Sequence, residues 1–150
     1  MSEDDGSAGP PPLVLDTSIL IAVARGDADA MTVIAHYDAS GRTLIIPALA
    51  MTAAALDMRT PDTEALLYGL EQLQNSLTAP LRDSEQAVAL ADVIARTGLD
   101  PWDAHVAGVA AASVCPILTL DAAKWRQHTG DLDEPLFIVE IADPEGDDRA

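Results

Sequence analysis

The sequence contains few aromatic residues and a single cysteine, and both scarcities restrict its structure. Aromatic residues make up 3% of the 150 residues and hydrophobic residues 49%, so the core must be built from Leu, Ile, Val and Ala. Because Cys115 is the one cysteine, the chain has no internal disulfide, which fits a reducing compartment. We expect Cys115 to be a small buried hydrophobic residue.

The sequence also has no long apolar run and few basic residues. Its apolar stretches are broken by charges well before the roughly 20 residues that a membrane-spanning helix needs. The acidic, Pro-rich N-terminus does not have the pattern of a signal peptide, so we expect a cytoplasmic protein without a membrane partner. Eight Lys and Arg residues against 25 Asp and Glu residues give a formal net charge of −17. This charge opposes broad attraction to nucleic acid, although bound cations can reverse the field at one site.

The length suits one domain, and acidic residues gather at both ends of the chain. We expect disordered acidic tails at 1–12 and 143–150 around a domain at 13–142. Apolar runs that alternate with helical patterns predict an α/β fold, a three-layer α/β/α sandwich with a central parallel sheet of about five strands. The strands are expected at 13–15, 43–46, 77–81, 116–120 and 136–142. Helices are expected at about 18–25, 27–40, 47–58, 84–96, 100–114 and 122–127. A further helix is expected to start at Thr60 and Pro61.

Three aspartates lie at the ends of apolar runs: Asp16 in LVLDTSIL, Asp103 in DPWDAH and Asp121 in ILTLD. Asp16 follows the first strand and Asp121 the fourth. If these strands are neighbours, both carboxylates lie at the carboxyl edge of the sheet, where ligands bind. Asp103 lies in the first turn of the helix that precedes the fourth strand and runs antiparallel to it. We therefore expect all three carboxylates on one rim.

Three clustered carboxylates repel one another unless a cation neutralises them. Oxygen ligands suit Mg²⁺ or Mn²⁺, and an ion held by these acids would support metal-assisted phosphodiester hydrolysis. Ser18 and Thr119 are expected to orient the acids or a bound water. Each aspartate taken alone also has a simpler interpretation, because Asp often caps a helix or follows a strand in a turn.

The segments LVLDTSILIAV, DAHVAGVAA and ILTLD resemble the PIN domain, and the length of the chain and the order of these segments resemble those of the VapC-type ribonuclease toxins. The resemblance extends over about residues 13–142. It implies an Mg²⁺-dependent endoribonuclease that hydrolyses RNA, with Asp16, Asp103 and Asp121 as catalytic metal ligands. In the toxin branch it also implies a homodimer and an antitoxin protein that lays a segment across the acidic groove.

One acid of the resembled pattern is missing from the chain. PIN domains of this kind carry a glutamate about six residues after the proline that follows the second strand, and here that position is Ala53. Asp57, one turn further on the same helical face, is the candidate compensating acid, although a turn displaces it by about 5.4 Å. The sequence thus predicts an impaired or specialised ribonuclease, or alternatively a catalytically inactive PIN-like module that binds a basic partner.

The residues after Asp121 allow two interpretations. Lys124 and Arg126 are candidate RNA contacts, with Trp125 available to stack on a base. Alternatively, the short helix is amphipathic and Trp125 lies in the core. His105 follows Asp103 by about 200° around its helix and should point away from the carboxylates.

Other helical stripes are expected to pack inward or to form a dimer surface. In the helix at 84–96, Ala87, Ala91 and Ile94 are expected to face the core. Two further stripes fit core packing and a dimer surface equally well. They are Met31, Ile34 and Tyr37, and Leu66, Leu70 and Leu73.

Overall fold

The computed structural model of the protein describes residues 9–128, 130, 132 and 135–141. This part of the chain forms a five-stranded sheet in the order β3-β2-β1-β4-β5, and every neighbouring pair is parallel. The strands are β1 (Leu13–Leu15), β2 (Leu44–Pro47), β3 (Ser76–Ala79), β4 (Ile117–Thr119) and β5 (Ile138–Glu140). The helices are α1 (Thr17–Ala24), α2 (Ala28–Ala39), α3 (Ala48–Asp57), α4 (Pro61–Glu71), α5 (Ser84–Thr97), α6 (Pro101–Ser113) and α7 (Ala122–His128). The tails expected to be disordered fall outside the described residues at 1–8 and 143–150.

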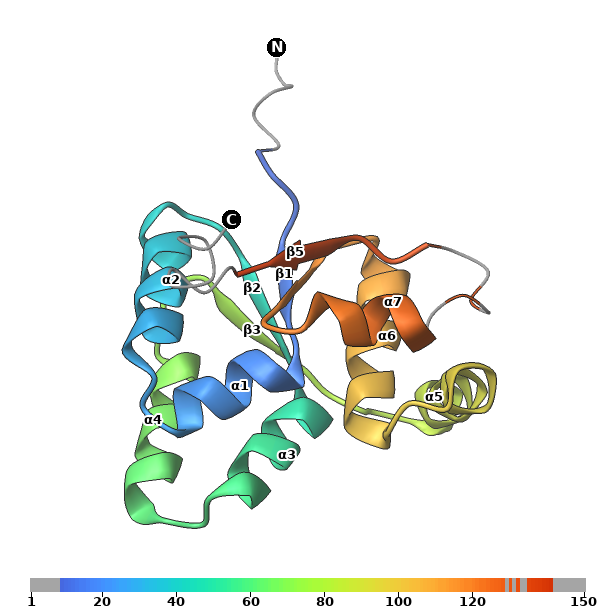
Figure 1. Cartoon of the computed structure of the whole chain (residues 1–150), viewed down its shortest axis with the longest axis horizontal. Coiled ribbons are helices and arrows are strands. Elements are labelled where there is room, and N and C mark those ends of the chain that lie inside the picture. Colours follow the sequence, from blue (N-terminus) through green and yellow to red (C-terminus); the bar gives the residue numbers. More distant parts are fainter. Residues whose placement is uncertain (1–8, 129, 131, 133–134, 142–150) are drawn as a thin grey trace.

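Helices cover both faces of this sheet. Figure 1 shows α1, α2 and α4 on one side of the strands and α5, α6 and α7 on the other. This arrangement confirms the predicted three-layer α/β/α sandwich with a parallel sheet of five strands. No helix in the described part of the chain is long and apolar enough to cross a membrane.

The direction of the chain through the sheet reverses between β1 and β4. The chain runs outward from β1 through β2 to β3, then crosses to β4 on the other side of β1. In the parallel pair β1–β4, Leu15 lies opposite Leu118, and the Asp16 amide donates to the Leu118 carbonyl at 3.2 Å. The first and fourth strands are therefore neighbours, as the position of Asp16 and Asp121 required. A reversal of this kind is where ligands bind in open parallel sheets.

The core lies between the sheet and its helices. All three residues of β1 and of β4 are fully buried, as expected for short apolar strands covered on both faces. The two stripes on α2 and α4 contribute to this core, because Ile34 and Leu70 are buried in it. Tyr37, Leu66 and Leu73 pack against it partly buried, whereas Met31 is exposed. Burying one such aliphatic side chain contributes about 1.5–3 kcal/mol to the free energy of unfolding.

The expected inner face of α5 is wrong at two positions. Ala87 and Ala91 are exposed, while Leu90, Val93 and Ile94 are the residues that pack against the core. None of the α5 residues is buried, because the helix packs mainly on α6, at the outside of the molecule. Its apolar face is therefore narrower than the alanines suggest.

The first turn of α3 receives its side-chain cap from another helix. Pro47, the N-cap residue of α3, makes no capping hydrogen bond. His105 on α6 supplies one instead, since its Nδ1 accepts from the Leu49 amide at 3.3 Å. The imidazole is buried, and burial lowers the pKa of His105 below its ordinary value of 6.5. As predicted, this side chain takes no part in the carboxylate rim.

We expect His105 to make the protein less stable in mild acid. Because its pKa is lower in the folded than in the unfolded chain, the unfolded chain takes up a proton first, and stability falls as the pH drops below about 6.5. In His105→Asn, a carboxamide oxygen replaces Nδ1 as acceptor and does not titrate. Urea unfolding across this pH range should give a flatter pH dependence for the variant than for the wild type. Equal slopes would contradict the assignment.

Candidate active site

Asp16 lies at the junction of β1 and α1 and is completely buried, with 0% relative exposure. It is the N-cap of α1: its Oδ1 accepts from the Ile19 amide at 3.0 Å and from the Ser18 hydroxyl at 2.6 Å. Its Oδ2 accepts from the indole Nε1 of Trp125 at 2.9 Å. Both carboxylate oxygens are thus hydrogen-bonded by groups of the chain itself.

Asp103 meets Asp16 across a lysine side chain. It lies in the first turn of α6, which starts at Pro101 after the N-cap Asp100, and is 7% exposed. The Nζ of Lys124 lies 3.4 Å from Asp103 Oδ1 and 4.0 Å from Asp16 Oδ2. The two aspartates come together on one rim as expected, and a positive charge lies between them.

Asp121 has a different role in this structure. Its side chain is exposed, and its Oδ1 accepts from the backbone amide of Lys124 at 3.2 Å, which caps the short helix α7. Its own amide donates to the Thr119 hydroxyl at 2.9 Å. The hydrogen bonds and ion pairs of the described residues do not join its carboxylate to Asp16 or Asp103.

Ser18 and Thr119 connect the two segments of the rim. The Ser18 hydroxyl donates to Asp16 and accepts from the Leu120 amide at 3.0 Å, and it lies 3.4 Å from the Thr119 hydroxyl. Through these contacts the two hydroxyls orient Asp16 and the loop that carries Asp121.

Neither position considered for a further acid supplies one to the rim. Ala53 lies in α3 and is buried, and its methyl group cannot bind a cation. Asp57, at the end of the same helix, forms a bidentate ion pair with Arg25, with Nε–Oδ2 and Nη2–Oδ1 distances of 2.8 Å. The hydrogen bond to Arg25 lowers the pKa of Asp57 and so favours its ionised form. Asp57 therefore joins the ends of α1 and α3.

The helix that follows Asp121 has its aromatic side chain inside. Trp125 is fully buried, so it belongs to the core and its ring face is not available to a nucleic-acid base. The Nζ of Lys124 lies 5.2 Å from the centre of the Trp125 ring, a cation–π distance. Arg126 is exposed. The interpretation of α7 as amphipathic is therefore confirmed.

The residues of the rim do not fit a bound Mg²⁺ or Mn²⁺. In the part of the chain that the structure describes, no three His, Cys, Asp or Glu side chains lie close enough together to hold a metal ion. The two carboxylates that do meet already face an ammonium group. Sequence reasoning did not predict that Lys124 lies between the two carboxylates. A signal was present in the neighbouring Trp125, because a buried indole N–H needs an acceptor and Asp16 was a candidate.

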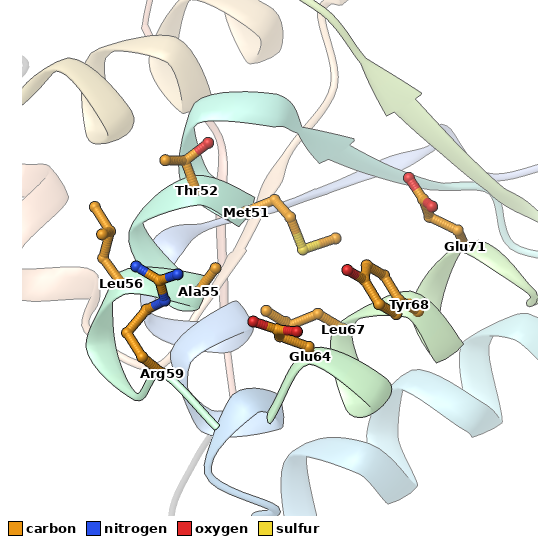
Figure 2. Close-up of a pocket in the computed structure, with 9 residues that line it drawn as sticks. All are labelled: Met51, Thr52, Ala55, Leu56, Arg59, Glu64, Leu67, Tyr68 and Glu71. Atoms are coloured by element: carbon orange, nitrogen blue, oxygen red, sulfur yellow. The ribbon is translucent and has the colours of Figure 1, made fainter. Parts of the chain in front are cut away.

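A pocket lies between α3 and α4. Figure 2 shows this pocket, which has a volume of about 350 Å³. Met51, Ala55 and Leu67 provide apolar surface, while the carboxylates of Glu64 and Glu71 come from α4. The remaining lining residues are Thr52, Leu56, Arg59 and Tyr68. The pocket combines apolar contacts with two acids and one base.

Comparison with known families agrees with this fold. The sequence model of the PIN domain matches residues 13–128, which is well over half of the chain. No curated protein matches the chain. The match includes β1 to α7, and therefore both aspartates of the rim and Lys124. The chain belongs to the PIN-domain family, whose fold is nuclease-like.

Proposed function

We propose that this protein is a catalytically silent PIN module that binds a positively charged protein partner. The observation that carries the proposal is the position of the Lys124 ammonium, 3.4 Å from Asp103 and 4.0 Å from Asp16. A lysine between two carboxylates offsets the negative charge that attracts a divalent cation. The two positions considered for a further acid do not supply one, because position 53 is an alanine and Asp57 is paired with Arg25.

Phosphodiester hydrolysis needs an ion or an equivalent group that positions water and stabilises the charge of the transition state. In this rim the oxygens of Asp16 accept hydrogen bonds from Ser18, Ile19 and Trp125. An aspartate engaged in this way has little capacity to orient a water. The formal net charge of −17 further weakens any approach of RNA and strengthens the approach of a basic protein.

The pocket between α3 and α4 suits a segment of such a partner. Glu64 and Glu71 favour Lys or Arg, and the apolar surface of Met51, Ala55 and Leu67 favours a hydrophobic anchor. We propose that the partner is an antitoxin-like protein and that an amphipathic, basic segment of it occupies this pocket.

The rival proposal is the Mg²⁺-dependent endoribonuclease of the VapC-like class. In its favour, Asp16 and Asp103 meet at the carboxyl end of the sheet where the strand order reverses, and Ser18 ties the loop of Asp121 to them. This function requires Lys124 to leave the two carboxylates.

Metal titration separates the two proposals. For the wild-type protein we expect calorimetry with millimolar Mn²⁺ to show no heat of specific binding. We also expect no cleavage of a structured RNA with Mg²⁺ or Mn²⁺. The ribonuclease predicts binding and cleavage that are lost in Asp103→Asn, retained in the exposed control Asp29→Asn and increased in Ala53→Glu. That second pattern would reject the silent module.

Binding of a basic segment in this pocket is tested with a model peptide of Lys and Leu residues. The peptide folds as an amphipathic helix with Leu on one face and Lys on the other. NMR titration should shift amide signals of α3 and α4. In Glu64→Lys/Glu71→Lys the affinity should fall about tenfold or more, because two attractive charges become repulsive. Glu85→Lys, which reverses one charge on α5, serves as the control. Equal loss in both variants would indicate attraction without a site.

We also propose that the protein is a homodimer through the face of β3, α5 and α6. A groove of about 740 Å³ lies there, and Leu77, which lines it, is 60% exposed. Exposed apolar patches of this kind are typical of interfaces. Light scattering should give the mass of two chains for the wild type and of one chain for Leu77→Asp. A wild-type monomer at high concentration would exclude the dimer.

A further inference from the structure

We propose that Lys124 is the resident cation of the PIN rim, an internal counter-ion whose removal turns Asp16 and Asp103 into a site for a divalent cation. The inference deepens the proposed function, since it names the group that keeps metal out. It concerns residues that the structure places in contact: one ammonium and two carboxylates from β1–α1, α6 and α7.

The burial of the two aspartates makes a counter-charge necessary. Asp16 has no solvent exposure and Asp103 is 7% exposed. Two ionised carboxylates in this environment repel each other and lose hydration, a cost that a nearby cation offsets. Lys124 is the basic residue whose nitrogen lies within 4.0 Å of both acids in the described part of the chain.

Lys124 is held in place by its neighbours and is not a freely moving surface lysine. Its side chain is only 23% exposed and lies over the ring of Trp125. Trp125 in turn donates to the same Asp16 oxygen, Oδ2, that Lys124 approaches. Two consecutive residues of α7 therefore present an N–H group and an ammonium to one carboxylate.

The start of α7 is fixed from two sides. The Lys124 amide donates to Asp121 Oδ1 at 3.2 Å, and the Ala122 amide donates to Glu140 Oε2 of β5 at 3.1 Å. These hydrogen bonds fix the backbone of the first turn of α7, from which the Lys124 side chain reaches the rim. The ion pair thus depends on the placement of the whole helix.

The charge balance explains why a metal would bind after Lys124 is neutralised. With Lys124, the pair of aspartates carries one uncompensated negative charge; without it, two carboxylates face each other with two. Hard oxygen ligands with this charge suit Mn²⁺ or Mg²⁺, which complete their coordination with water. A protein ammonium and a divalent ion are therefore alternatives at one position.

The test uses Lys124→Met, which removes the charge and keeps most of the stem, in the full-length chain. Arg126→Met removes a positive charge from the same helix at an exposed position and is the matched control. Lys124→Arg retains the charge. Thermal unfolding is measured in chelator and in millimolar Mn²⁺, and Mn²⁺ binding is measured by calorimetry.

In chelator, Lys124→Met should melt roughly 5 °C lower than Arg126→Met, because the aspartates repel each other. Mn²⁺ should raise the melting temperature of Lys124→Met and give a binding signal in calorimetry at a concentration about tenfold below that at which the wild type still gives none. Lys124→Arg should behave like the wild type. An unchanged melting temperature of Lys124→Met in chelator, or the absence of its Mn²⁺ response, would overturn the inference.

A double variant covers the case in which Lys124→Met does not fold. In Lys124→Met/Asp103→Asn the repulsion is removed with the lysine, so this variant should fold and be more stable than Lys124→Met. If it also fails to fold, the role of Lys124 is packing and the inference is rejected.

Failure of this inference is distinguishable from failure of the proposed function. Metal binding and RNA cleavage by the wild type would reject the silent module. If the wild type neither binds metal nor cleaves RNA and Lys124→Met does not respond to Mn²⁺, only the counter-ion role of Lys124 is rejected.

Discussion

A carboxylate without solvent contact must obtain its hydrogen bonds and its counter-charge from the chain, and Asp16 imposes this requirement on the molecule. Its oxygens are met by the first turn of α1, by Ser18 and by the indole of Trp125, with Lys124 slightly further away. These groups come from opposite ends of the PIN domain. The position of α7 against the sheet is therefore coupled to the charge at the end of β1.

The rest of the rim is arranged around this coupling. Asp103 enters at the start of α6 and shares the ammonium, whereas Asp121 caps α7 and so helps to present Lys124. At the C-terminal end of α1, Arg25 forms an ion pair with Asp57 and so holds the end of α3. Asp16, Asp103 and Asp57 are thus engaged in contacts that join one helix to another.

The fold was predictable from the sequence because its signals are local. LVL and ILT are short apolar runs buried on both faces, and Pro47, Thr60 and Asp100 mark helix starts. The alternation of strands and helices then leads to a parallel sheet, and a strand order that reverses beside β1 brings Asp16 and Asp103 together.

The contacts within the site depend on side-chain directions, which the periodicity of apolar residues in the sequence does not specify. Whether Lys124 points to the rim or to solvent follows from the burial of Trp125 next to it, and that burial follows from the packing of α7 on the sheet. The Arg25–Asp57 pair likewise requires the crossing of α1 over α3. The hydrogen bond from Leu49 to His105 joins residues whose patterns are unrelated in the sequence.

The sheet ends at β3, and this has a consequence for the behaviour of the protein at high concentration. β3 forms one edge of the sheet, only four residues long, and Pro80 follows it directly. Because a proline offers no amide hydrogen and a short strand offers few, a foreign strand finds little to pair with beyond Ala79. The nearby Arg82 and Asp83 add charge where such growth would continue. The fold thus carries its own protection against fibrillar aggregation at this edge.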